Sequence, residues 1–325
     1  MSNVILKVLN LEVEYATAKG PARAVDGVSF ELETGEFLAI VGESGCGKST
    51  LLFAIARLLT SPAEIVGGSV IFDGKDLLNL TSEELRQLRA RDISVVMQSA
   101  MNALNPTISI GAQLADTCRA HTDWDDAQVL ARSKEVLSMV SIDPVHLNSY
   151  AFQLSGGMRQ RAMIAMALLL SPKLIIMDEP TSALDVVAQR SLMSRIQSLR
   201  KQLGFSVIFV THDMNVVSHF SDRLAVMYAG QIVELGRTDE VFNRPRHPYS
   251  IGLLDAFPAL VGENRELTGI PGNPPALVNK SPGCQFAPRC PKVQDLCRGS
   301  APALDEVGSH ISRCFFPSLI SGVRA

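Results

Sequence analysis

One short stretch of the chain has the residue types and spacing needed to bind phosphate groups. Between the apolar run 37–41 and a helical run that begins at Thr50 lies Gly42-Glu43-Ser44-Gly45-Cys46-Gly47-Lys48-Ser49. The glycines let the backbone curl so that successive N–H groups point inward, and the following helix adds its positive N-terminal end. We therefore predict a P-loop for a nucleoside triphosphate, with Lys48 reaching the β- and γ-phosphates and Ser49 reaching Mg²⁺.

Two adjacent carboxylates end another apolar run, 174–177. Ligands of open α/β folds collect at the carboxyl ends of the strands. Because side chains alternate along a strand, Asp178 and Glu179 point to different sides. Asp178 suits the Mg²⁺ shell and Glu179 suits polarising an attacking water. Such a pair is usually a solvated surface feature, but the P-loop in the same chain favours the catalytic interpretation.

A second candidate anion site lies at Leu154-Ser155-Gly156-Gly157-Met158, where a helix is predicted to begin. It combines a hydroxyl, two glycines that permit close approach, and a helix N-terminus. The alternative is an ordinary serine N-cap.

The chain as a whole has the composition of a globular protein large enough for a main domain and an appended one. Its 325 residues are 46% hydrophobic and 19% charged, with a net charge of −3. This balance argues against nucleic acid as a partner. We expect no export signal and no membrane span, since no run reaches about 18 apolar residues.

The apolar patterns predict an α/β fold with a parallel sheet and an antiparallel β-layer. Residues 4–15 and 24–32 alternate as half-buried strands do, whereas 37–41, 174–177 and 207–210 are apolar throughout. The spacing becomes helical between 99 and 153. Proline, glycine and cysteine become frequent after about residue 244.

Together these motifs resemble the nucleotide-binding subunit of ATP-binding cassette (ABC) transporters, over residues 3–242. The resemblance implies a P-loop ABC ATPase core in 1–242, a helical subdomain inserted at about 99–165, and a small Cys-rich extension over 243–325. The signature normally reads Leu-Ser-Gly-Gly-Gln, and Met158 takes the place of its glutamine.

Further site residues are implied by the same resemblance. Tyr15 would stack on adenine, Gln98 would contact Mg²⁺ or water, and His212 would hold the γ-phosphate. Asp185 belongs to the loop 182–185 that communicates across a dimer. In that dimer the signature of one subunit would serve the γ-phosphate bound to the other, through Ser155, Gly156 and Gly157. The implied catalytic set is Lys48, Gln98, Glu179 and His212, and the implied Mg²⁺ ligands are Ser49, Gln98 and Asp178.

The C-terminal residues narrow the family. Arg246-His247-Pro248-Tyr249-Ser250 and the run from Cys284 to Cys290-Pro291 resemble the extension of oligopeptide, dipeptide and nickel importer ATPases. Within that group the chain looks like the first of two paralogous ATPase subunits. The resemblance implies a heterodimer with the second subunit, two membrane permeases and a periplasmic or lipid-anchored binding protein. It places the chain at the cytoplasmic face of the inner membrane, as a peripheral protein.

Peptides are the expected substrate, with oligosaccharides, opines and nickel as alternatives. A soluble ABC ATPase acting on ribosomes or DNA is the alternative from another class. Ribosomal members usually carry two cassettes, and repair ATPases a long coiled coil between P-loop and signature. This chain has one set of motifs, with about a hundred residues between them.

Four of the six cysteines lie in the last 42 residues, separated by 5, 6 and 16 residues. In a chain without an export signal, such clustering favours metal binding over disulfides. Four thiolates suit zinc or an iron–sulfur cluster equally well, and free thiols are a third possibility. The family resemblance favours a [4Fe–4S] cluster on Cys284, Cys290, Cys297 and Cys314. Cys46 and Cys118 are expected to be small buried or loop residues.

Overall fold

The structure is a computed structural model that describes residues 3–97, 103–181, 184–256 and 269–318. Its described residues form two compact units. The first comprises segments 1–5, 32–36 and 79–209, and the second comprises 6–31, 37–78 and 210–325. Each unit is described by itself.

The first unit is built on parallel strands. The strands β6 (Ile93–Val96), β7 (Leu174–Asp178) and β8 (Ser206–Val210) follow one another in the sheet as β8-β7-β6. Ile93 pairs with Leu174 and Val96 with Met177 in parallel register. Every residue of β7 and β8 is buried, as expected for strands covered on both faces. The runs predicted as buried strands are therefore confirmed.

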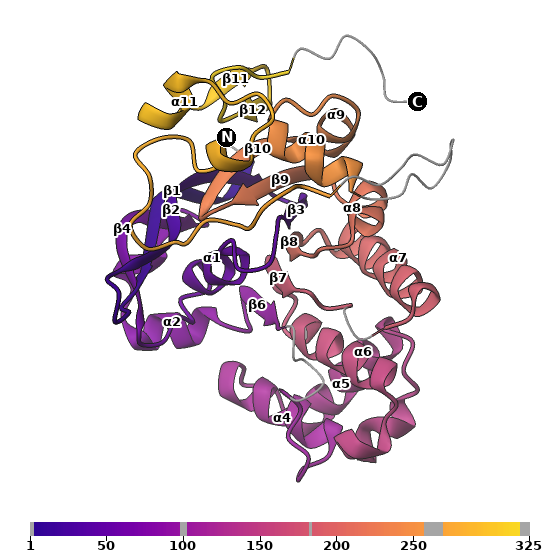
Figure 1. Ribbon diagram of the computed structural model, residues 1–325. Helices are drawn as coiled ribbons and strands as arrows, with labels where there is room; N and C mark the ends of the chain where they lie inside the picture. The colour runs from indigo at the N-terminus through magenta and orange to yellow at the C-terminus, as the bar shows by residue number, and fades with distance from the viewer. Residues whose placement is uncertain (1–2, 98–102, 182–183, 257–268, 319–325) are drawn as a thin grey trace. The chain divides into compact units, whose positions relative to one another are not determined.

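Helices of this unit begin at polar caps. Ser155 and Asp185 cap α6 and α7, and Asp125 forms a capping box with Gln128 at α5. Helices α4, α5 and α6 pack side by side, which confirms the predicted helical region (Figure 1). The helices are α2 (Ser82–Leu88), α4 (Ile110–His121), α5 (Asp126–Met139), α6 (Gly156–Leu168) and α7 (Val186–Leu203).

The second unit contains the predicted antiparallel layer and further strands. The layer has the order β2-β1-β4-β5, with β1 (Val4–Tyr15), β2 (Ala22–Glu33), β4 (Ala63–Phe72) and β5 (Lys75–Asp76). The other strands follow the order β11-β12-β10-β9-β3, where β3 pairs in parallel with β9 and β10 runs antiparallel to β9. Their bounds are β3 (Phe37–Val41), β9 (Arg223–Tyr228), β10 (Gln231–Arg237), β11 (Asp305–Val307) and β12 (His310–Ser312).

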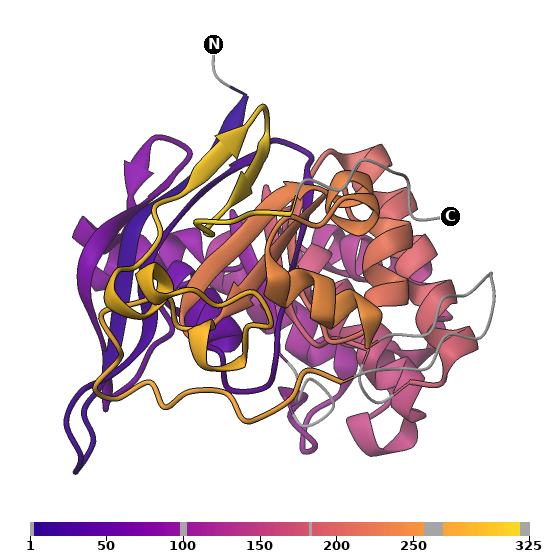
Figure 2. The same cartoon turned by 45° about the horizontal axis from the view of Figure 1, so that its top comes forward.

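The C-terminal residues share the core of these strands. Tyr249 and Phe286 join one buried apolar cluster with residues such as Val41, Val226 and Tyr228. The hairpin β11–β12 runs alongside β10 (Figure 2). The extension thus obtains a core by packing on the cassette strands. The helices of this unit are α1 (Lys48–Ile55), α8 (Met214–Phe220), α9 (Thr238–Asn243), α10 (Pro248–Asp255) and α11 (Asp295–Gly299).

A buried carboxylate fixes the start of α10. Glu234 on β10 accepts hydrogen bonds from the backbone N–H groups of Arg246 and His247, at 2.7 and 2.8 Å, and contacts Nε2 of His310 at 2.7 Å. Burial lowers the pKa of His247 to about 4, so its ring is neutral at physiological pH. Its Nδ1 accepts the N–H of Tyr249, which fixes the first turn of α10.

Within the ranges that the structure describes, no helix is both long and apolar enough to cross a membrane.

Candidate functional site

The predicted P-loop is a tight turn between β3 and α1 in the second unit. Gly42 and Gly47 have φ values of 152° and 106°. A Cβ atom would lie 2.1 Å from the Met227 carbonyl oxygen at Gly42, and 2.0 Å from that of Ala24 at Gly47. Only glycine fits at these two positions, because β9 and β2 approach the loop backbone so closely.

The loop curls around the ammonium group of Lys48. This side chain is only 7% exposed, and its Nζ donates to the carbonyl oxygens of Gly42 and Glu43, at 2.8 and 2.9 Å. Lys48 is also the first residue of α1, so a fixed positive charge and a helix N-terminus coincide. This arrangement can bind an anionic phosphate chain. Cys46 in the loop is buried, as predicted, and burial raises the pKa of its thiol.

Two other predicted site residues of the second unit adjoin the segment from β3 to α1. The Tyr15 hydroxyl, at the end of β1, lies 3.2 Å from Oγ1 of Thr50 on α1. The backbone N–H of Thr211 bonds to the carbonyl of Ile40 on β3, at 3.4 Å, and the exposed His212 follows directly. Ser49, the predicted Mg²⁺ ligand, is half-buried on α1.

The first unit carries the predicted carboxylates. Asp178 is the buried last residue of β7, and Glu179 follows with φ 44°, in the left-handed region that a glutamate rarely adopts. Strained backbone of this kind concentrates at functional sites. The backbone therefore leaves the extended conformation at Glu179, directly after the last residue of β7.

The signature segment is the N-terminus of α6 in the same unit. Ser155 is its N-cap and accepts the N–H of Met158 at 3.3 Å, so the structural alternative to an anion site is present. Gly156 and Gly157 occupy the first turn, whose N–H groups have no partner within a helix. Asp185 caps α7 by accepting the Ala188 N–H at 2.8 Å. Gln98 and residues 182–183 lie outside the described residues.

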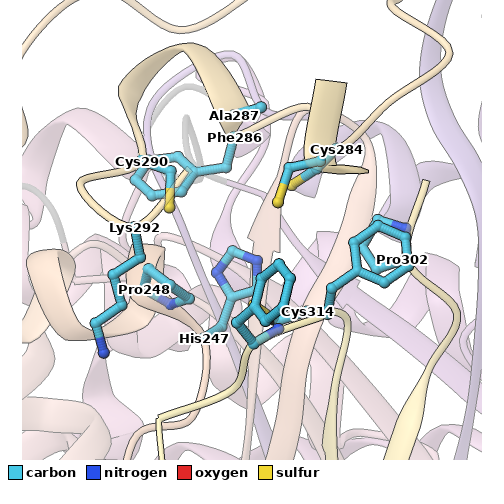
Figure 3. Close-up of a pocket in the computed structure, with 12 residues that line it drawn as sticks. His247, Pro248, Cys284, Phe286, Ala287, Cys290, Lys292, Pro302 and Cys314 are labelled. Atoms are coloured by element: carbon cyan, nitrogen blue, oxygen red, sulfur yellow. Dashed lines mark hydrogen bonds between the residues drawn. The ribbon is translucent and has the colours of Figure 1, made fainter. Parts of the chain in front are cut away.

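The four C-terminal cysteines surround one small cavity in the second unit. Cys284, Cys290, Cys297 and Cys314 line it, together with His247 and Phe286, around about 20 Å³ of space. The sulfur atoms of Cys284 and Cys290 point toward the same space (Figure 3). Burial raises the pKa of Cys314 to about 11 and shifts those of Cys284 and Cys290 upward, so without a metal these thiols are protonated.

The cavity does not confirm a metal centre. Among the described residues, no three His, Cys, Asp or Glu side chains converge in a way that could hold a metal ion. All four cysteines line one cavity, as their clustering in the sequence suggests, but metal binding and the identity of any bound group stay predictions.

Two side chains that contact the P-loop were missed by sequence reasoning. The hydroxyl of Tyr249 and the guanidinium of Arg289 both bind Glu43, which is 206 and 246 residues away from them in the chain. In the sequence, the segments that contain Tyr249 and Arg289 stand out only by their likeness to a family. No local spacing signals contacts between residues so distant in sequence.

Comparison with known proteins decides the family. The family model described as "ABC transporter" matches residues 25–182, and "Oligopeptide/dipeptide transporter, C-terminal region" matches 233–297. The oligopeptide transport ATP-binding protein OppD of Salmonella typhimurium is 43% identical over 318 residues, which is 97% of this chain and 95% of that protein. The chain belongs to the ABC transporter ATP-binding protein family. Within that family, the dipeptide transport ATP-binding protein DppD of Bacillus subtilis is 45% identical over 96% of this chain and 94% of its own length.

Solved structures agree with this assignment. The ATP-binding cassette MJ0796, in a dimeric post-hydrolysis state bound to ADP and Pi, aligns with a TM-score of 0.65 and 29% identity. The alignment covers 72% of this chain and 98% of the cassette. CbiO1 of Clostridium perfringens, part of an ABC transporter complex, gives the same TM-score of 0.65 at 28% identity, over 74% of this chain and 91% of its own. The α/β cassette fold with an inserted helical region is thereby confirmed.

Proposed function

We propose that the chain is the ATP-hydrolysing, energy-coupling subunit of a binding-protein-dependent ABC importer for di- or oligopeptides. The observation that carries this proposal is the 43–45% identity to OppD and DppD, which extends through the C-terminal region. The cassette would comprise residues 1–242, with its helical insertion at about 99–165, and the extension residues 243–325.

Binding of ATP would rest on the P-loop. Its backbone N–H groups and Lys48 hold the phosphates, Thr50 belongs to the same first turn of α1, and Tyr15 stacks on the base. Mg²⁺, when bound, neutralises charge on the phosphate oxygens. Residues present in the chain fit that ion, because hydroxyl, amide and carboxylate oxygens suit it. They are Ser49, Gln98 and Asp178.

Hydrolysis would require one carboxylate and several groups that stabilise the negative charge on the γ-phosphate. Glu179 polarises the attacking water, while Lys48 and His212 stabilise the charge that develops. The signature N–H groups at Ser155, Gly156 and Gly157 would do the same for ATP held by the other subunit. Each subunit alone would then have an incomplete site.

An exposed apolar pair supports such a subunit contact. Val186 and Val187 directly follow Asp185 and are 77% and 80% exposed. A water-exposed pair of valines at a helix start suits a surface that a partner covers. The proposed partner is a paralogous ATPase. Two membrane permeases and a periplasmic or lipid-anchored substrate-binding protein complete the assembly, which places this chain peripherally at the cytoplasmic face of the inner membrane.

Co-purification tests the transport function. Full-length Glu179→Gln protein, extracted in mild detergent with ATP and Mg²⁺, is expected to bring down two permeases and a second ATPase, identified by mass spectrometry. A binding protein recovered with them would supply the ligand that names the substrate. Recovery of ribosomal or DNA-repair proteins alone would instead overturn the importer while leaving the ATPase chemistry in place.

The cysteine cavity supports a [4Fe–4S] cluster as part of this proposal. One zinc ion would bring four sulfur atoms to within about 3.8 Å of one another, given Zn–S bonds of about 2.3 Å. No three potential ligands of the described residues converge as a bound metal requires, although all four cysteines line one cavity. The choice of a cluster over zinc therefore rests on the family resemblance, and metal analysis decides between the two. The role of the cluster would be structural, because it would link the separate segments of the proline-rich C-terminal extension that carry the four cysteines.

Metal analysis of the full chain tests this prediction. Anaerobically purified protein is expected to contain about four iron atoms per chain and to absorb in the visible thiolate-to-iron region. Cys290→Ser should lose most of that iron, whereas Cys118→Ala, on α4, should keep it. One zinc ion per chain would indicate a zinc site in place of the cluster. No metal, with all four thiols free, would indicate that the cysteines bind no metal.

A further inference from the structure

Arg289 of the C-terminal extension forms a two-point ion pair with the P-loop. Its two terminal nitrogens donate to the two carboxylate oxygens of Glu43, at 2.7 and 2.9 Å. The Arg289 side chain is 6% exposed and that of Glu43 is 23% exposed. A paired fork of this kind is among the stronger and more directional contacts in proteins. Glu43 is the second residue of the loop that would cradle the phosphates.

The guanidinium of Arg289 is fixed from several sides. Its Nε donates to the carbonyl of Pro271 at 2.8 Å, and a terminal nitrogen donates to that of Ile270 at 3.3 Å. Another contact reaches the Tyr228 hydroxyl at 3.3 Å, and the guanidinium carbon lies 5.8 Å from the centre of that ring. These contacts hold the side chain in one orientation, so it presents its charge to Glu43 without further loss of conformational entropy.

A second group from the extension holds the backbone of the same loop residue. The N–H of Glu43 donates to the hydroxyl of Tyr249 at 2.9 Å, and Tyr249 is fully buried. Its ring packs 4.5 Å from Tyr228 and 5.4 Å from Phe286, between centroids. The carbonyl of Glu43 meanwhile accepts from Lys48. All three polar groups of Glu43 are therefore engaged, two of them by the extension.

The charge on Glu43 gives Arg289 a specific task. A carboxylate in a phosphate-binding loop would repel the triphosphate that the loop has to hold. We infer that Arg289 is a positioning residue for ATP, which neutralises Glu43 and holds the P-loop in its phosphate-binding curl. This inference rests on the ATP site proposed above. It makes the affinity of the cassette for ATP depend on the Cys-rich extension, because Arg289 lies between Cys284 and Cys290.

A double-mutant cycle separates this role from general stabilisation. The dissociation constant for ATP with Mg²⁺ is measured by calorimetry on the full chain, for Arg289→Gln in the presence of Glu43 and in a Glu43→Gln background. With Glu43 present, Arg289→Gln is expected to weaken ATP binding about tenfold, since it leaves an unpaired carboxylate beside the phosphates. In the Glu43→Gln background the same change is expected to alter affinity less than about twofold, because the repelling charge is gone.

Further variants keep the test decisive. Arg237→Gln removes a comparable arginine whose pair with Asp239, at 3.1 Å, is exposed, and it should leave ATP affinity unchanged. Arg289→Lys keeps the positive charge but cannot form the two-point pair, so about a threefold loss of ATP affinity is expected. This variant replaces Arg289→Gln in the test if Arg289→Gln does not fold. Equal losses in both Glu43 backgrounds, or a lower melting temperature with unchanged ATP affinity, would overturn the positioning role. Wild-type protein that fails to bind ATP would overturn the proposed ATPase as well.

Discussion

Glu179→Gln is expected to lower the rate of ATP hydrolysis by about 10²–10³-fold while ATP binding persists. The carboxylate is the group that would accept a proton from the attacking water. An amide keeps the size of the side chain and can still hydrogen-bond the water, but it cannot take the proton. The loss corresponds to about 2.7–4 kcal/mol of transition-state stabilisation.

The backbone explains why this effect should stay local. Glu179 follows the buried strand β7 and adopts φ 44°, so its direction is set by a turn that glutamine can adopt equally well. Asp178, the proposed Mg²⁺ ligand, remains in place as the last residue of that strand. Binding of ATP, which depends on the P-loop and the metal, should therefore be retained.

Steady-state phosphate release and equilibrium ATP binding give the two measurements. Glu135→Gln is the matched control, because Glu135 lies exposed on α5, where it pairs with Arg132 at 2.8 Å. It should hydrolyse ATP at the wild-type rate. If Glu179→Gln protein hydrolyses ATP at the wild-type rate, Glu179 has no part in the mechanism. If the variant no longer binds ATP, Glu179 does more than polarise the attacking water.

Local patterns in the sequence were sufficient to predict the strand, loop and helix that carry the P-loop. The apolar run before Gly42 and the helix starting near Thr50 are neighbours in the chain, so their spacing alone predicts a strand, a loop and a helix in that order. The same holds for β7 with Asp178 at its end. Patterns of this kind can be recognised in the sequence because each element is specified by residues that are close together in the chain.

The contacts of the extension could not be predicted in this way. Tyr249 and Arg289 reach Glu43 only because the C-terminal segments pack on β3, β9 and β10, and that packing depends on a shared apolar cluster. The buried Glu234 is a similar case, since in sequence it is a single acidic residue within β10. Its partners Arg246, His247 and His310 lie 12, 13 and 76 residues away. The role of a buried carboxylate of this kind becomes visible only in the folded structure, where its hydrogen-bond donors surround it.

All four C-terminal cysteines line one cavity, but their spacing in the sequence does not give the distances between their sulfur atoms. Whether four sulfur atoms suit one ion or a cluster depends on how far apart the backbone holds them. Here that backbone includes the N–H of Cys284, which donates to the carbonyl of Cys297 at 2.8 Å. Spacing of 5, 6 and 16 residues is compatible with either geometry.

Gly47→Ala is expected to weaken ATP binding by about 10²-fold or more. The new Cβ would lie 2.0 Å from the carbonyl oxygen of Ala24, a backbone atom that cannot move aside as a flexible side chain could. The loop would have to shift by about 1 Å, a displacement that typically costs about 10²-fold where groups must be aligned. Gly74→Ala is the matched control, because Gly74 has φ 78° in the turn between β4 and β5 and nothing within 4 Å of its added Cβ. It incurs only the left-handed backbone penalty of about 1–2 kcal/mol and should bind ATP normally.

Calorimetric titration with ATP and Mg²⁺, beside thermal unfolding of both variants, separates lost binding from lost stability. Normal ATP affinity in Gly47→Ala protein would mean that the close approach of β2 does not shape the phosphate site.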